Sequence, residues 1–444
     1  MHLGEALAQA AEFAESERFE QLGQHLDPSW IERALQATGT VTIRRRRLPA
    51  EQVVWLVIGM GLFRGESIER VVDLLDIPLP DRDDTAIAKS AISQARQRLP
   101  EEPLAYLFER TAAEWATRSA QAHRWRGLTL YGMDGTTMRV PDSPENRLAF
   151  GAPHGRDGAS GYPQVRMVAL MALRSHVLAA VRFSPWITGE TTLARQVWSE
   201  IPEDSLTIVD RNFLVKKDLI HLETSGNRHW LSRTKTNTRW AVTKKLGRDD
   251  YLAEWDVRET GLRGKWEIRV IHYKRKGFPR STLLTSLVDA KKYPAKELVA
   301  LYHERWEMEL AYDEVKTHLL DRRETIRSRT PGGVRQEIWG IAIAYNLVRR
   351  EMERVADLVG VSPTRISFVT ALFYIRDELS WMRGRTLAFG TVPARLKRLE
   401  ARLKRLLLPE RRAQRAFPRA VKIKMSNYPR KRPLSSGLSE RHCG

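Results

Sequence analysis

Cysteine is almost absent from this sequence. The 444 residues include a single cysteine, Cys443, next to the C-terminal residue. A disulfide within the chain requires two cysteines and a cysteine metal cluster requires several, so both are excluded. Such sparse use of cysteine is typical of a reducing compartment, and we expect a cytoplasmic protein.

Long hydrophobic runs are also missing. The longest, Val53–Phe63, has 11 residues, two of them glycine, whereas a membrane-spanning helix needs about 20 apolar residues. The N-terminal stretch "MHLGEALAQAAEFAESERFE" is acidic and lacks the basic start and apolar centre of a secretory signal. We therefore expect a protein without a membrane partner.

Acidic residues are too few to balance the basic ones. Asp and Glu number 54 against 74 Lys and Arg, which gives a formal net charge of +20. A surplus of this size favours a polyanionic partner, and nucleic acid is the commonest one. A ribosome-associated or simply basic protein has a similar charge, so composition alone does not separate these classes.

The sequence divides into five parts with different patterns. Residues 1–126 are expected to form a helical N-terminal DNA-binding domain. In 127–228, short apolar strand segments alternate with helical ones, which predicts the first part of a mixed α/β core. Residues 229–290 alternate apolar and polar side chains like antiparallel strands. Helical periodicity resumes over 291–385 for the rest of the core and C-terminal helices, and 386–444 is a basic tail.

One N-terminal segment has the composition of a DNA-reading helix. "DDTAIAKSAISQARQRLP" predicts a short helix that Asp84 or Thr85 caps and that ends before Pro100. Its lysine, serine, glutamine and arginine side chains are types that contact phosphates and groove edges. An ordinary exposed helix has the same composition, so both interpretations stay open.

Two aspartates follow apolar strand segments. "LTLYGMDG" predicts a strand that ends in a turn at Asp134, and "SLTIVD" predicts a strand that ends at Asp210. An acid at the carboxyl end of a strand lies at the rim of an α/β sheet, where active sites form. Turns favour aspartate for structural reasons too, so each residue taken alone is also explained without catalysis.

A third acid lies in a helix predicted over residues 295–320. At about 100° per residue, four of its polar residues fall within a stripe of about 60°: Tyr302, Arg305, Glu309 and Lys316. A carboxylate beside cations and a hydroxyl suits a metal ligand next to bound phosphates. Asp313 falls near the same stripe and is an alternative to Glu309. A salt-bridged, solvent-exposed helix has the same pattern.

These residues resemble the signature of the insertion-sequence-four family of bacterial transposases. The family pattern around its glutamate is Y-x2-R-x3-E-x6-K, which the four residues of the stripe meet in order. "DGTT" at Asp134 and "DRNF" at Asp210 resemble the two aspartate motifs of the family. The likeness extends over most of the chain, from about residue 20 to about residue 380.

The resemblance implies a fold and a catalytic triad. The fold is an α/β, RNase H-like mixed-sheet core with a β-rich insertion, a helical N-terminal domain and a helical C-terminal region. The triad is Asp134, Asp210 and Glu309, which favours Glu309 over Asp313. These carboxylates are expected to hold two Mg2+ (or Mn2+) ions, the hard cations that prefer oxygen ligands and act in pairs on phosphodiesters.

The resemblance also implies DNA contacts. Tyr302, Arg305 and Lys316 are expected to bind phosphates near the cut, with Arg211 as a further contact. In relatives, a tryptophan of the insertion stacks on a flipped base. Four tryptophans of this sequence lie in the corresponding region, and the resemblance does not decide which of them would take that role: Trp230, Trp240, Trp255 and Trp266. A core position explains each of them equally.

The expected function is cut-and-paste transposition. The enzyme would cleave double-stranded DNA at the inverted-repeat ends of an insertion sequence and join those ends to target DNA, acting as a homodimer on paired ends in the bacterial nucleoid. Two alternatives stay open. One is a metal-dependent nuclease without strand transfer, and the other is a catalytically inactive DNA-binding protein from a decayed element.

Overall fold

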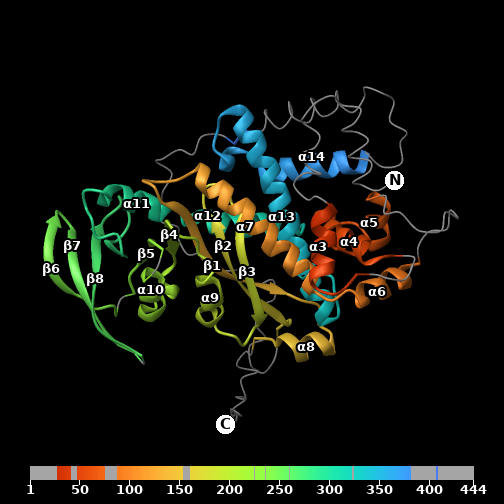
Figure 1. Ribbon diagram of the computed structural model, residues 1–444, viewed down its shortest axis with the longest axis horizontal. Coiled ribbons are helices and arrows are strands. Elements are labelled where there is room, and N and C mark those ends of the chain that lie inside the picture. Colours follow the sequence, from red (N-terminus) through yellow and green to blue (C-terminus); the bar gives the residue numbers. More distant parts are fainter. Residues whose placement is uncertain are drawn as a thin grey trace, which may run out of the picture.

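A nine-stranded mixed sheet runs from the middle of the molecule to one end, where β6, β7 and β8 lie outermost (Figure 1). The computed structural model describes residues 28–41, 48–75, 88–153, 161–224, 226–235, 237–259, 261–322, 325–381 and 407–408. The cap expected at Asp84 or Thr85, and the tail expected over 386–444 apart from residues 407–408, lie outside these ranges.

The sheet has the strand order β3-β2-β1-β4-β5-β9-β8-β7-β6. Its strands are β1 (Thr129–Arg139), β2 (Gln164–Ala172), β3 (Leu178–Pro185), β4 (Ser205–Val209), β5 (Arg228–Arg233), β6 (Ala241–Gly247), β7 (Asp250–Glu259), β8 (Leu262–Tyr273) and β9 (Ser281–Thr285). β1, β4 and β5 run parallel, while β2 is antiparallel to both β1 and β3. The mixed α/β fold class predicted from the sequence is confirmed.

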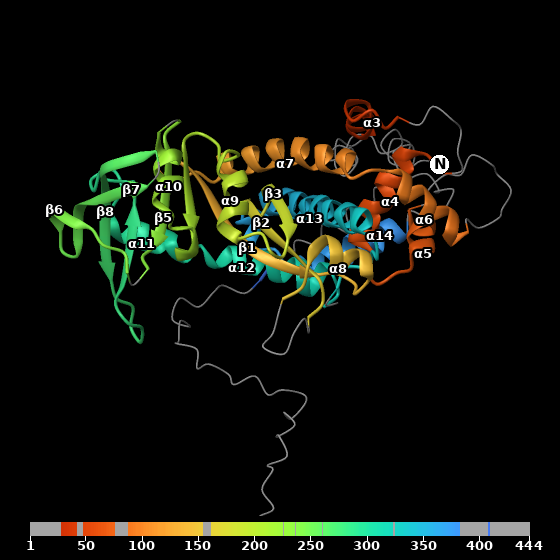
Figure 2. The same ribbon diagram turned by 90° about the horizontal axis from the view of Figure 1, so that it is seen from below.

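Helices cover both faces of this sheet. On one face, α9 (Glu190–Trp198) and α10 (Lys216–Glu223) share a hydrophobic core with the sheet. On the other, α11 (Ala295–His303) and α12 (Trp306–Asp313) join a second, larger core (Figure 2). β2, "QVRMVALMA", is a nearly continuous apolar run because it is buried from both sides.

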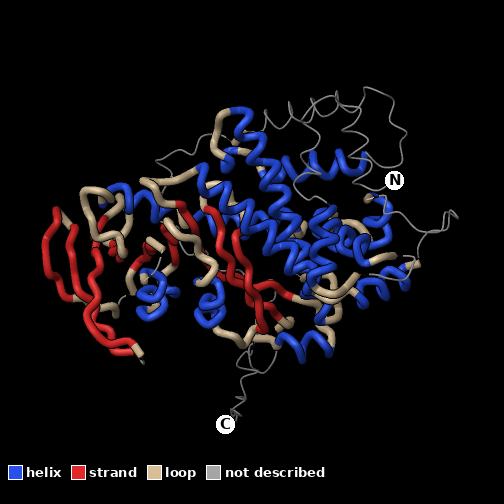
Figure 3. The backbone as a smooth tube through the Cα atoms, viewed as in Figure 1, coloured by secondary structure: helices blue, strands red, loops and turns tan. Residues whose placement is uncertain are grey.

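Most of the remaining helices gather at one end of the sheet (Figure 3). Before the sheet come α3 (Pro28–Ala37), α4 (Ala50–Leu62), α5 (Ile68–Leu74), α6 (Lys89–Arg98) and α7 (Glu102–Ala122). Between its strands lie α8 (Pro144–Phe150) and the 3-10 turn η1 (Arg211–Phe213), and after it come the π-helix η2 (Glu314–Leu319), α13 (Pro331–Val359), the 3-10 turn η3 (Pro363–Arg365) and α14 (Phe368–Trp381). α13, the longest, packs along α4 and α7 and so ties the N-terminal helices to the core.

The segment over 229–290 does not form a separate sheet. β5, at its start, pairs in parallel with β4, and β9, β8, β7 and β6 follow in antiparallel pairs along the same sheet. The alternation of apolar and polar residues predicts four of these strands, at "HWLSRTK", "YLAEWDV", "WEIRVIHYKR" and "STLLTSLVD". β6 escaped prediction because its residues are largely exposed and carry no buried apolar face.

Two predicted boundaries are wrong: the end of β1 and the extent of the helix that carries Glu309. β1 does not end at Asp134 but continues to Arg139, because β2 pairs with it from Tyr131 to Arg139. The helix predicted over 295–320 is broken by turn residues Glu304 and Arg305 and ends in a π-helix. Glu304 leaves the helical run to pair with Arg174, 3.0 Å away, on the turn between β2 and β3.

Close contact between α4 and α13 depends on small residues. A Cβ atom added at Gly340 would lie 2.6 Å from the backbone oxygen of Val57 and 2.8 Å from its side chain. Backbone atoms cannot move aside as a flexible side chain can. Ala344 makes a similarly close approach to Gly61, so the two helices touch almost backbone to backbone.

We therefore expect Gly340→Ala to destabilise the protein despite the higher helix propensity of alanine. Separating the two helices should cost about 1–3 kcal/mol of unfolding free energy, measured by chemical denaturation. Gly332→Ala, in the first turn of the same helix with no atom near its added methyl group, is the matched control and should be neutral or stabilising. Equal effects of the two changes would contradict this account of the interface.

Candidate active site

Strand register brings the two predicted aspartates together. β1 and β4 pair in parallel with Met133 opposite Val209, so Asp134 and Asp210 are the next residues on neighbouring strands. Side chains at equivalent positions of parallel strands point to the same face. Both carboxylates therefore lie on the face that α12 covers, although 76 residues of chain separate them.

Glu309 reaches the same place from α12 through an arginine. Arg305 donates a hydrogen bond of 2.8 Å to the Glu309 carboxylate, and another nitrogen of its guanidinium lies 3.8 Å from Asp134. Asp313, the alternative to Glu309, is 59% exposed and accepts a hydrogen bond from Thr317 instead. The break before α12 thus turns Glu309, and not Asp313, toward the two strands.

The surroundings of Asp134 oppose its ionisation. Burial is the main cause that raises the pKa of this carboxyl to about 6, and the negative charges of Glu190 and Asp210 act in the same direction. The Gly135 N–H, which donates to Asp134 at 2.8 Å, and the positive charge of Arg305 partly offset them. Negative charge concentrated in a half-buried site favours the binding of a cation.

The other residues of the predicted stripe surround this centre. Tyr302 is 7% exposed, and burial raises the pKa of its hydroxyl to about 12. Lys316 donates a hydrogen bond to Thr136 on β1, and burial lowers the pKa of its ammonium group. Arg211 is exposed directly after Asp210. All lie close to the aspartates, but the helix break and the π-turn replace the regular stripe drawn on a helical wheel.

Two residues that the sequence did not predict also contact this centre. Tyr312 donates a 2.6 Å hydrogen bond to the backbone oxygen of Asp134 and so holds α12 on β1. Glu190, the first residue of α9, lies against Gly135 from the opposite face of the sheet. Nothing in "WITGETT" distinguishes Glu190 from an ordinary acid in the first turn of a helix.

A buried polar network holds the end of the helix that carries Glu309. Glu314, in the π-helix, accepts hydrogen bonds from Arg349 at 2.6 and 2.7 Å and from the Tyr345 hydroxyl at 2.7 Å. Arg349 also donates to Nδ1 of His176, whose Nε2 lies 2.9 Å from Glu307. The network links α12 and the π-helix to α13 and to the turn between β2 and β3.

The tryptophans of the strand-rich segment differ in burial. Trp230 and Trp255 are fully buried and stack at 5.6 Å between ring centroids. The carboxylate of Glu223 accepts hydrogen bonds from the indoles of Trp230 and Trp266. Trp240 is partly exposed beside His272. Trp230 and Trp255 are therefore core residues in this structure.

The side chains of the centre are of the kinds that bind a divalent cation. In this structure, however, the space between Asp134 and Glu309 is occupied by Arg305. The carboxylates offer the oxygen ligands that Mg2+ and Mn2+ prefer. Within the described ranges, no group of three or more His, Cys, Asp or Glu side chains stands close enough together to hold a metal ion. Between Asp134 and Glu309 lies the guanidinium of Arg305.

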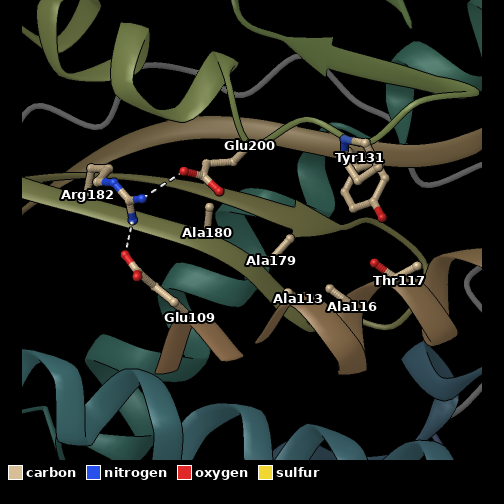
Figure 4. A pocket seen from close by; sticks show the side chains of 10 residues that line it. Glu109, Ala113, Ala116, Thr117, Tyr131, Ala179, Ala180, Arg182 and Glu200 are labelled. Carbon is tan, nitrogen blue, oxygen red and sulfur yellow. Dashed lines mark hydrogen bonds and ion pairs between the residues drawn. The ribbon is translucent and has the colours of Figure 1, made fainter. Parts of the chain in front are cut away.

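A cavity of about 140 Å³ lies on the other face of the sheet, between α7 and β3 (Figure 4). Arg182 forms ion pairs with Glu109 at 3.2 Å and Glu200 at 2.9 Å across it. Small alanine side chains line it, and Tyr131 lies at its wall. None of the predicted catalytic or DNA-contacting residues lines this cavity.

Comparison with known proteins decides the family. The profile of the insertion element 4 transposase N-terminal family matches residues 16–109, and that of the transposase DDE domain matches 125–347. Transposase InsG for insertion sequence element IS4 of Escherichia coli strain K12 is 37% identical over 438 residues, or 97% of this chain and 98% of that protein. The chain belongs to the IS4 family of transposases.

Two further similarities accompany this match. InsZ of the same strain is 33% identical over 281 residues, which is 62% of this chain and 91% of that protein. A solved piggyBac transposase synaptic complex with hairpin DNA has a TM-score of 0.40 and 12% sequence identity, over 92% of this chain and 86% of that one.

As a member of the IS4 family, this transposase is an enzyme that acts on DNA, and DDE transposases generally depend on divalent metal ions. The family, the RNase H-like fold and the transposase function predicted from the sequence are thereby confirmed. Among the described residues, no helix has the length and hydrophobicity that crossing a membrane requires.

We expect the IS4-family transposase to lose stability steeply in acid because of Glu314. Burial opposes ionisation of this carboxyl, but Arg349 and His176 outweigh it and lower its pKa to about 2, against an ordinary value of 4.5. A depressed pKa contributes stability at neutral pH that disappears as the pH falls from about 5 toward 2. Glu314→Gln should be less stable at neutral pH and lose less on acidification, as measured by denaturation at several pH values.

Removing Arg349, the cation of this network, should lower the unfolding free energy more than removing a surface cation does. Arg349→Met leaves Glu314 buried without its partner and should cost about 3–5 kcal/mol. Arg335→Met, on the same helix, removes a partly exposed ion pair with Glu101 and should cost about 0–1 kcal/mol. Similar losses of unfolding free energy for the two variants would show that the network does not stabilise the fold.

Proposed function

We propose that this transposase cuts insertion-sequence ends and joins them to target DNA with Asp134, Asp210 and Glu309 as its catalytic carboxylates. The observation that supports the triad most directly is the register of β1 on β4, together with the Arg305 bridge from Glu309 to Asp134. Acids from distant parts of the sequence thus approach one another near the carboxyl end of β4, where Arg305 lies between Asp134 and Glu309.

In this proposal, the triad holds two Mg2+ or Mn2+ ions. When bound, such ions neutralise charge at phosphorus and activate the attacking oxygen. Asp134 and Asp210 present carboxylates from rigid neighbouring strands, and Glu309 presents a third from α12. Arg305 lies beside Asp134 and Glu309 in the structure, and it would be available to bind a DNA phosphate as a charge-assisted donor if these carboxylates held metal ions.

The two chemical steps, cleavage and joining, need the same residues in the same places. In the first, water displaces the 3′ oxygen of a phosphodiester at the element end and frees a 3′ hydroxyl. In the second, that hydroxyl displaces an oxygen at phosphorus in target DNA. Both are in-line displacements, so one set of carboxylates serves both, while Tyr302, Lys316 and Arg211 line the approach of the phosphates.

DNA recognition is assigned to the basic surfaces outside this centre. On α6, Lys89, Ser90, Ser93 and Gln94 are exposed, and their types suit phosphate and base-edge contacts. Arg96 instead anchors this helix by donating to Ser328 at 3.1 Å. We propose that two copies of the chain act as a homodimer on paired inverted-repeat ends in the bacterial nucleoid.

Replacing Glu309 tests the triad. Glu309→Gln keeps the size of the side chain and its ability to accept a hydrogen bond from Arg305, but removes the charge. We expect end-specific cleavage in Mg2+ to fall to background while binding to inverted-repeat DNA stays near wild type in a gel-shift assay. Asp313→Asn is the matched control, one helical turn further on, and should cleave normally. Normal cleavage by Glu309→Gln would exclude Glu309 from the triad.

Strand transfer separates transposition from simple nuclease action. Supplied with precut ends that carry a 3′ hydroxyl, and with a target plasmid, the wild-type enzyme should produce joined molecules in Mg2+. Asp210→Asn should produce none with the same substrates. A wild-type preparation that nicks uncut ends but never joins precut ones would identify a nuclease, and one that does neither would identify an inactive DNA-binding protein.

A further inference from the structure

Glu190 is a fourth acid at the centre, and no motif of the sequence points to it. It is the first residue of α9, the helix that follows β3, and it approaches β1 from the face opposite Glu309. A carboxylate on the far side of a strand is ordinarily held away from the near side by the side chains of that strand. Here the strand residue beneath it is Gly135.

The glycine allows an unusually close approach. A Cβ atom built on Gly135 would lie 1.7 Å from the carboxylate oxygen of Glu190 and within 2.8 Å of two of its carbons. No other neighbours come as close to that position, so the Glu190 side chain itself fills the space of the missing methyl group. The carboxylate therefore rests on the backbone of β1 directly after Asp134.

This position places negative charge beside negative charge. Glu190 repels both Asp134 and Asp210 electrostatically, and the positive charge of Arg166 on β2 acts against this repulsion. Among the described residues, no ion pair within 4 Å and no hydrogen bond is found for the Glu190 carboxylate. Several half-buried negative charges close together cost free energy unless a cation binds between them.

We propose that Glu190 is a fourth carboxylate ligand of the active site, which binds, together with Asp134 and Asp210, the divalent ion nearest the sheet. The role rests on the proposed metal-dependent function of the triad. Glu309 approaches that centre from α12 and Glu190 from α9, so carboxylates would reach a bound ion from both faces of the sheet. Gly135 is then required because any larger residue would displace the ligand.

The test is a titration of the full-length protein with Mn2+ alone, followed by the electron paramagnetic resonance of the free ion. Glu190→Gln keeps the shape of the side chain and removes its charge, and should weaken Mn2+ binding by about 10- to 100-fold. Glu145→Gln removes a similar acid from the first turn of α8 and controls for the loss of a charge at a helix start. It should bind Mn2+ like the wild type.

Thermal unfolding supplies a second readout that a purely structural role would not give. Without divalent ions, Glu190→Gln should unfold at a higher temperature than the wild type, because it relieves repulsion. With saturating Mn2+, its gain in unfolding temperature should be smaller than the wild-type gain. A variant that is destabilised equally with and without Mn2+ would show that Glu190 supports the fold and does not bind the ion.

Gly135→Ala tests the same carboxylate without changing it. The methyl group should push the flexible end of Glu190 away and weaken Mn2+ binding to a similar degree. The double variant Gly135→Ala with Glu190→Gln should be no weaker than the more affected single one, because both changes remove one interaction. Additive losses would overturn the proposal, and this variant also tests it if Glu190→Gln fails to fold.

Asp134→Asn distinguishes failure of this proposal from failure of the proposed function. If Asp134→Asn loses Mn2+ binding while Glu190→Gln binds like the wild type, the triad stands and the role of Glu190 is overturned. If the wild type binds no Mn2+, or Asp134→Asn binds it unchanged, the metal site of the triad itself is wrong, and the role of Glu190 is overturned with it.

Discussion

The buried ion pair between Arg349 and Glu314 is the interaction on which the placement of the proposed catalytic carboxylate Glu309 depends. Both groups are removed from water, so neither tolerates loss of the other. Glu314 lies five residues after Glu309, and its attachment to α13 sets where the helix that carries Glu309 ends and how it is rotated. His176 extends the same network to the sheet from a left-handed backbone conformation, with φ of 64°, which its buried contacts help to hold.

The π-helix follows from the same network. A wider turn over Glu314–Leu319 shifts the phase of the side chains relative to a regular α-helix, so that Glu314 points to Arg349 while Lys316 points to Thr136. At the other end, Glu304 is drawn to Arg174. The helix that carries Glu309 is thus short and held at both ends, which fixes the direction of one carboxylate at the expense of regular helical geometry.

Glycine has a different role at the two close contacts of this structure. At Gly340 it lets two helices meet at the backbone and joins the N-terminal helices to the core. At Gly135 it lets a carboxylate of α9 reach a strand whose other face carries Asp134. The acids at this edge repel each other, and Arg305 and Arg166 lie where they balance that charge.

The sequence by itself determined the family, the α/β class and most strands. Apolar periodicity and the spacing of Tyr302, Arg305, Glu309 and Lys316 are local features of the sequence, so they can be recognised without knowledge of the tertiary structure. It also placed Asp134 and Asp210 at the ends of strands. It ended β1 too early because a glycine after an acid is typical of a turn. Only the pairing with β2 shows that the strand continues beyond Asp134. Only the tertiary structure decided that β1 and β4 are neighbours in register, that the long helix breaks at Glu304, and that Glu190 joins the centre. Those facts come from pairing and burial between residues far apart in the chain, and no local pattern records them.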